Sequence, residues 1–149
     1  MSKFFKGFTL IELLVVITVI GLLSAMVLVG LSGVRAQGRD TRRIADLRNL
    51  QNGLEIYFNK NSQYPASANS CQSTWNTLQT ALGGQLPKDP LNRDQYCYSY
   101  AKSSDGLHYT LRARLEDGEN SALDNDLDGT QNGLDCSDTS TNPYYCIGL

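Results

Sequence analysis

The residues with the clearest capacity for chemistry are carboxylates spaced two apart toward the carboxyl end of the chain. Asp124, Asp126 and Asp128 precede Gly129, and Asp135 stands at the twelfth position counted from Asp124. Side-chain oxygens at positions 1, 3 and 5, a glycine at 6 and a carboxylate at 12 match the spacing of a calcium-binding loop. The pattern predicts calcium, with these ligands: Asp124, Asp126, Asp128, the backbone carbonyl of Thr130, and Asp135.

Charge balance around this loop gives the same indication. The segment from Glu116 to Leu149 holds eight acidic residues and no lysine or arginine. Such a segment repels itself unless a cation neutralises it, so the alternative to calcium is a solvated acidic loop. Asp117 and Glu119 are additional candidate ligands. Because no helices are expected to flank the loop and position 12 is not the usual glutamate, a true EF-hand is not predicted.

Motifs of enzymes are missing from the sequence. His108 is the only histidine, which argues against a zinc or facial-triad site, and its place in an alternating segment turns it outward. There is no nucleophile elbow and no glycine-rich phosphate loop. Nucleic-acid binding is not indicated either, because no basic patch with interleaved aromatic residues occurs. The sequence therefore predicts a protein that is not an enzyme.

Four cysteines, all beyond residue 70, indicate disulfides formed in an oxidising compartment. Four cysteines allow three connectivities, and proximity in sequence is the argument for pairing Cys71 with Cys97 and Cys136 with Cys146.

The element that precedes these sites is a long helix. Residues 13–34 form a run of 22 residues without a charge, long enough to span a membrane. An apolar stripe at helical spacing then continues through Ile44, Leu47, Leu50, Leu54 and Tyr57. With no proline before Pro65, one helix over residues 8–58 is expected, transmembrane over 8–34 and amphipathic over 35–58. Bending or local unwinding is expected between Gly30 and Gly38.

The remaining residues, 59–149, are expected to form a globular head. Trp75, Leu78 and Leu82 share one face of a short helix that two glycines terminate. A hairpin follows, with strands around Tyr98 and over residues 107–115. A small antiparallel sheet packed on the second half of the long helix gives an α+β fold. The acidic loop 116–138 and the residues after it show no periodicity.

The amino-terminal residues GFTLIELLVVI resemble the signal of type IV pilins and type II secretion pseudopilins, with Gly7 closing a basic leader and Glu12 inside the apolar run. The resemblance implies that a prepilin peptidase removes residues 1–7, that the new amino terminus of Phe8 is methylated, and that Glu12 neutralises the Phe8 amine of a neighbouring subunit. Residues 64–65 (YP) and 86–92 (LPKDPLN) are similar to the head of the major pseudopilin. In that family, calcium and a carboxyl-terminal disulfide loop recur.

The function expected from this resemblance is that of a structural subunit. The chain would be a single-pass precursor in the inner membrane, assembled by an inner-membrane platform into a homo-oligomeric helical filament in the periplasm or at the cell surface. The alternative is a monomeric, membrane-anchored, extracytoplasmic calcium-binding or adhesive module. Four arginines follow the apolar run, at positions 35, 39, 42 and 43, and they outnumber Lys3 and Lys6 before it. A positive-inside count alone would therefore place the head in the cytosol. Disulfides and calcium instead favour a head outside the cytosol.

Overall fold

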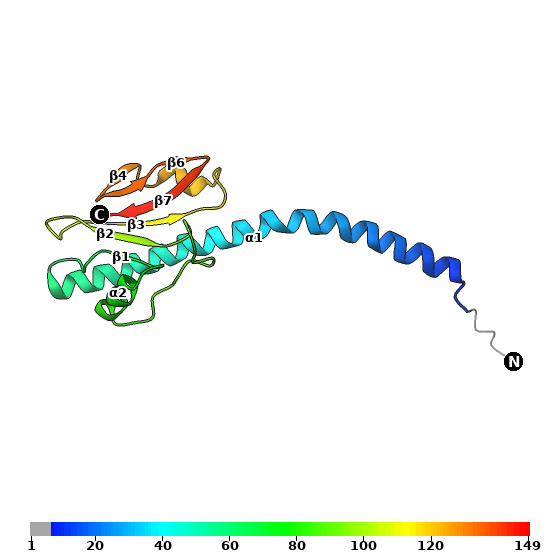
Figure 1. Cartoon of the computed structure of the whole chain (residues 1–149), viewed down its shortest axis with the longest axis horizontal. Coiled ribbons are helices and arrows are strands. Elements are labelled where there is room, and N and C mark those ends of the chain that lie inside the picture. Colours follow the sequence, from blue (N-terminus) through cyan, green and yellow to red (C-terminus); the bar gives the residue numbers. More distant parts are fainter. Residues whose placement is uncertain (1–6) are drawn as a thin grey trace. The chain divides into compact units, whose positions relative to one another are not determined.

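The structure is a computed structural model that describes residues 7–149, without the side chains of residues 27–31. It consists of two compact units, Met1–Arg35 and Ala36–Leu149. The first helix, α1 (Leu10–Asn61), contributes to both units (Figure 1). We describe each unit separately.

Helix α1 agrees with the helix predicted over residues 8–58. It is helical throughout Gly30–Gly38, so the local unwinding expected there is not observed. Part of the predicted membrane span lies outside the described residues, because the span includes the side chains of residues 27–31. Among the helical residues that are described, no stretch combines the length and the apolar character that crossing a membrane requires.

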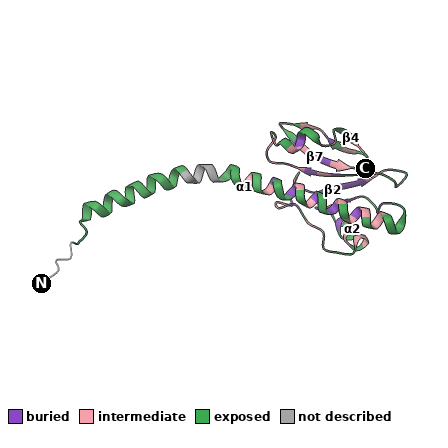
Figure 2. Ribbon diagram, turned by 180° about the vertical axis from the view of Figure 1, so that it is seen from behind, coloured by how far each residue is buried: buried purple, intermediate pink, exposed green. Residues whose placement is uncertain are grey.

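The core of the second unit forms where the apolar stripe of α1 meets a sheet. Leu47, Leu50 and Leu54 are at most 1% exposed and belong to one cluster with the buried residues of the sheet. Burial of each leucine contributes roughly 1.5–3 kcal/mol. Figure 2 shows buried residues recurring along this part of α1 and along β2. The amphipathic half predicted from the sequence is therefore the half that builds the core.

The main sheet has five antiparallel strands in the order β1-β2-β3-β7-β6. Their bounds are β1 Ala68–Asn69, β2 Ser99–Lys102, β3 Tyr109–Arg114, β6 Asp138–Thr139 and β7 Asn142–Gly148. The predicted hairpin is β2 with β3, in which Tyr100 lies opposite Leu111. Tyr109, Leu111 and Ala113 are fully buried, as alternation predicts, but Leu107 lies before β3 and is 50% exposed.

A short helix, α2 (Thr74–Leu82), completes the core. Trp75 and Leu78 are buried, and Gly83 ends the helix in the left-handed conformation that glycine adopts without strain. Leu82 packs beside Gly53 of α1, where a Cβ would lie 3.5 Å from its methyl carbon. Both the helix and the glycines that end it were predictable from the sequence.

Strands form after Glu116, although the sequence shows no periodicity there. Strand β7 pairs with β3 along five residues and places Tyr145 and Cys146 in buried positions. A separate hairpin joins β4 (Gly129–Gln131) to β5 (Leu134–Cys136) through Asn132 and Gly133. Both turn residues have positive φ, 49° and 83°, as a two-residue hairpin turn requires. A 3-10 helix, η1 (Ser121–Asn125), precedes this hairpin.

Candidate functional site

Glu12 belongs to a capping box at the start of α1. Its Oε2 atom accepts hydrogen bonds from the Thr9 backbone N–H at 2.9 Å and from the Thr9 hydroxyl at 2.7 Å. The Glu12 backbone N–H in turn lies 3.3 Å from the Thr9 hydroxyl oxygen, completing the reciprocal pattern. Glu12 therefore has a local role in starting the helix, which the sequence analysis did not consider.

Apolar side chains cover the helix around Glu12 on all sides. Phe8 is 80% exposed, Ile11 70% and Ile20 56%, and the other large apolar residues described in Phe8–Met26 are also about half exposed or more. A helix that is apolar around its whole circumference requires lipid or other chains to cover it. Glu12 is the only acidic or basic residue between Phe8 and Met26.

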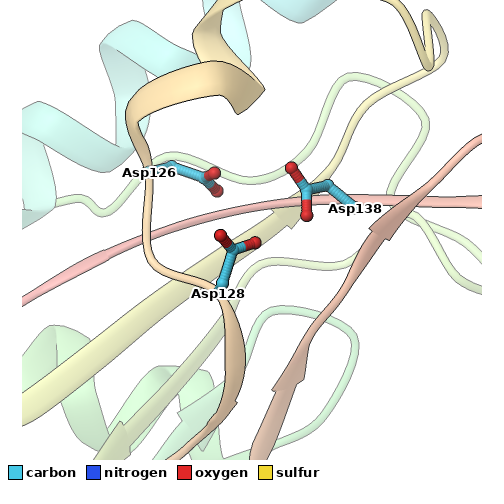
Figure 3. A group of neighbouring side chains, drawn as sticks. All are labelled: Asp126, Asp128 and Asp138. Atoms are coloured by element: carbon cyan, nitrogen blue, oxygen red, sulfur yellow. The ribbon is translucent and has the colours of Figure 1, made fainter.

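Three carboxylates converge in the second unit, at Asp126, Asp128 and Asp138. One oxygen from each lies within 4.8 Å of the others. Figure 3 shows the three side chains pointing toward one another, from the residue after η1, from the residue before β4 and from the start of β6. This group could hold a hard cation, because Ca²⁺ prefers several carboxylate oxygens around it.

The electrostatics of this group favour a bound cation. Burial, together with the nearby charges of Asp138 and Asp128, raises the pKa of Asp126 to about 6. The Cys146 N–H, which donates to the Asp126 Oδ2 atom at 2.6 Å, acts in the opposite direction and lowers this pKa. The Asp126 Oδ1 atom is buried and has no hydrogen-bond partner within the described part of the chain. The carboxyl group of Asp138 likewise raises the pKa of Asp128. A divalent cation would stabilise the ionised forms of Asp126 and Asp128 and would give the Asp126 Oδ1 atom a partner.

The other predicted ligands lie elsewhere. Asp124 is exposed in η1, and Thr130 lies opposite Asp135 as a backbone pair of the β4–β5 hairpin. The Asp135 carboxylate accepts hydrogen bonds from the Ser137 N–H and hydroxyl, and Asp117 accepts one from the Glu119 N–H. The calcium-loop spacing did not indicate Asp138. The only sign of Asp138 in the sequence was that it is one more carboxylate, two residues after Cys136.

A buried group of charges fixes the start of the acidic segment to α1. The Arg43 guanidinium is 0% exposed and donates to Asp89 at 2.7 and 3.0 Å, to Asp40 at 2.7 Å and to Glu116 at 2.6 Å. Burial alone would lower the pKa of Arg43, but these hydrogen bonds outweigh it and raise the pKa. Arg39 also binds Glu116, and hydrogen bonds first from Arg39 and then from Arg43 hold the pKa of Glu116 at about 2.

Backbone groups complete this attachment. The Asp40 carboxylate accepts hydrogen bonds from the N–H groups of Glu116 and Asp117 at 3.0–3.1 Å. Asp89, in the loop 86–92, accepts one from Leu91 at 2.8 Å. In the sequence, Arg39 and Arg43 stand out only as charges beyond the predicted membrane span, and no local pattern indicates these contacts.

Two disulfides close the structure, Cys71–Cys97 and Cys136–Cys146. This is the pairing that proximity in sequence favours. The first joins the residues before α2 to those before β2, and the second joins β5 to β7. The acidic segment is thus held at its start by the Arg43 ion pairs and at its end by a buried disulfide.

Comparisons with known proteins indicate the family of the chain. A family profile described as "Prokaryotic N-terminal methylation motif" matches residues 3–28. The chain is 34% identical over 113 residues, 69% of its length and 77% of the relative's, to type II secretion system core protein G of Klebsiella pneumoniae. It is 29% identical over 126 residues, 76% of its length and 83% of the relative's, to the protein of that name from Escherichia coli K12. No solved structure matches the chain.

A methylation motif on a long amino-terminal helix, followed by a small antiparallel sheet packed on that helix, defines a protein of the pilin and pseudopilin class. Within that class, the chain belongs to the family of type II secretion system core protein G.

Proposed function

We propose that this chain is the structural subunit of a type II secretion pseudopilus and assembles through its amino-terminal helix into a helical filament. The observation that carries the proposal is the apolar surface of residues 8–26, interrupted by the single carboxylate of Glu12. In an apolar environment this charge is costly unless a cation pairs with it. Cleavage after Gly7 by a prepilin peptidase would create the cation, the methylated amine of Phe8 on a neighbouring subunit.

The precursor's route follows from the same features. Before assembly, the amino-terminal helix would anchor the chain in the inner membrane, with the head outside the cytosol, where its disulfides form. An assembly platform in that membrane would then bring subunits together. The apolar helix surface passes from lipid to neighbouring helices and stays covered throughout.

Variants at Glu12 and Thr9 test this proposal. Glu12→Ala and Glu12→Gln are both expected to abolish filaments, because both remove the charge, although glutamine retains an oxygen that can cap α1. Thr9→Val removes the hydroxyl of the capping box but keeps the charge, and it is expected to form filaments. Electron microscopy of material sheared from cells that express the full chain measures the outcome.

The controls for this test are processing and folding. Mass spectrometry is expected to find a methylated Phe8 as the first residue in every variant, and an intact Met1–Gly7 leader in the unmodified chain would overturn the proposal. If Glu12→Gln forms normal filaments while Thr9→Val does not, Glu12 acts as a helix cap and not as a charge partner. A monomeric tethered module predicts no effect of any of these substitutions.

We also propose that the head binds calcium, with Asp126, Asp128 and Asp138 as carboxylate ligands. The support is the convergence of their oxygens and the buried Asp126 Oδ1 atom, which lacks a partner among the described residues. Asp124, Thr130 and Asp135 remain the other ligands predicted from loop spacing, and Asp117 and Glu119 remain additional candidates. Bound calcium would join the residue after η1 to β6 and would lower the repulsion within the acidic segment.

Calcium is expected to stabilise the folded head. A ligand that binds only the folded state adds about 2.7 kcal/mol to the free energy of unfolding at 100 times its dissociation constant. Asp128→Asn should remove this gain, whereas Asp135→Asn, a matched loss of one carboxylate, should retain it. Thermal melting of the full chain in detergent, with calcium and with chelator, measures the difference. The reverse result for these two variants would favour the twelve-residue loop, and unchanged melting of the unmodified chain would exclude calcium binding.

A further inference from the structure

The outer face of α1 in the second unit is basic. Arg42, Arg48 and Lys60 are exposed on this face, and the Arg42 side chain is 63% exposed. Its ion-pair partner is Asp46, at 3.6 Å, a contact of little strength at a solvated surface. The exposed residues between these cations are uncharged: Ala45, Asn49, Asn52, Ile56 and Asn59.

The acidic residues of the same helix segment point inward. Between residues 40 and 61 they are Asp40, Asp46 and Glu55. Asp46 accepts a hydrogen bond from the Tyr98 hydroxyl at 2.8 Å, and Glu55 accepts from the hydroxyls of Tyr64 and Tyr109 at 3.0 and 3.1 Å. Asp40 is fully buried with Arg43. Asp46 is the only one of these three carboxylates in an ion pair with an exposed cation of the outer face, so the exposed charge on that face is net positive.

The carboxyl-terminal segment of the same unit has the opposite charge. Of its eight acidic residues, Glu116 is in ion pairs, with Arg39 and Arg43. Among the described residues, no acidic residue from 117 to 138 forms an ion pair. Glu119, Asp124, Asp128 and Asp135 are exposed, and the segment contains no cation of its own. Three of the other acidic residues form the proposed calcium site, and Glu119 and Asp135 lie outside it.

We propose that the basic outer face of α1 in one copy of this chain docks against the acidic carboxyl-terminal segment of the next copy. The occupant is a second copy because the chain itself carries both complementary surfaces, on different elements. A contact between two different patches is heterologous, and repetition of such a contact builds an open filament instead of a closed dimer. The inference rests on the proposed filament and specifies which surfaces of the heads meet within it.

Solvated charges of this kind act mainly on the rate and specificity of association. Each exposed pair contributes little by itself, while opposed surfaces steer the partners together and like charges repel wrong arrangements. The docking should therefore weaken as salt concentration rises, because the screening length falls to roughly 3 Å at 1 M ionic strength.

Charge exchange between the two surfaces tests the proposal. The helix variant, Arg42→Glu/Asn49→Glu, and the segment variant, Glu119→Lys/Asp135→Lys, each place like charges opposite one another. Each is expected to reduce the number of filaments about tenfold or more, because repulsion replaces attraction at two positions of one surface while the other surface is unchanged. A chain that carries all four substitutions regains opposite charges and is expected to form filaments within about twofold of the unmodified number.

The design separates docking from folding and from cation binding by the three converging aspartates. Arg48 is unchanged because it lines a cavity that also contains Asp126, and the three converging aspartates are unchanged. The fourfold variant carries every substitution of the other two, so damage to folding cannot explain its recovery. Normal filaments from both double variants, or failure of the fourfold variant, would overturn the inference. Absence of filaments from the unmodified chain would instead overturn the proposed function.

Discussion

Replacing Arg43 with methionine is expected to lower the free energy of unfolding of the head by about 3–5 kcal/mol, because removal of one partner from a buried ion pair leaves uncompensated charge. Arg43 is fully buried, and its loss would leave the carboxylates of Asp89 and Asp40 without their guanidinium. The neighbouring Arg42 provides a matched control, since its side chain is 63% exposed. Arg42→Met should change stability by no more than about 0.5 kcal/mol.

The chain contains its own reporter for this measurement. Trp75 is the only tryptophan and is fully buried in the core, so its fluorescence follows unfolding of the head in denaturant. Both variants should be compared with the full chain in the same detergent. If Arg43→Met and Arg42→Met unfold at the same denaturant concentration, the ion pairs of Arg43 do not hold the head together.

Loss of the Cys136–Cys146 disulfide is expected to cost more than loss of Cys71–Cys97, although it closes the shorter loop. Loop-closure entropy alone gives about 3 kcal/mol for the separation of 10 residues and about 3.5 kcal/mol for 26. Cys136 and Cys146 are both 0% exposed, whereas Cys71 is exposed. Replacing the buried pair with alanine therefore adds a cavity cost of about 1–2 kcal/mol, for a total near 4–5 kcal/mol.

Paired substitutions compare directly how much stability is lost with each disulfide. Cys136→Ala/Cys146→Ala and Cys71→Ala/Cys97→Ala are each made as double variants, so that no free thiol remains. Their unfolding is followed through Trp75 under identical conditions. A larger loss for Cys71→Ala/Cys97→Ala would show that loop length, and not burial, decides what each disulfide contributes.

The features predictable from sequence were those with short-range signals. The stripe of Leu47, Leu50 and Leu54 predicted the buried face of α1, and the glycines after Leu82 predicted the end of α2. Disulfide pairing followed from proximity along the chain. The helix signals lie within a few turns, where spacing in sequence determines spacing in the structure, and each cysteine pairs with its nearest cysteine along the chain.

Contacts between distant residues could not be predicted in this way. Arg43 meets Asp89 and Glu116, which are 46 and 73 positions away, and nothing in the local pattern distinguishes Arg43 from Arg42. Asp138 joins Asp126 and Asp128 only because β6 pairs with β7 and brings it back.

In the acidic segment, two signals competed. Spacing favoured a calcium loop over residues 124–135, while Asn132–Gly133 is a strong hairpin signal, and the hairpin formed. No strand was predicted over residues 142–148, where β7 forms.

The attachment of α1 to the rest of the head determines how mechanical force passes through the subunit. Apolar contacts at Leu47 and Leu54 are non-directional and resist sliding weakly, whereas the hydrogen-bonded ion pairs of Asp40 and Arg43 have fixed geometry. They join the helix to the loop of Asp89 and to the segment of Glu116. A force applied along α1 at Ala36 would therefore be transmitted to the sheet as shear across these hydrogen bonds. The helix and the sheet of the 36–149 unit would then move together.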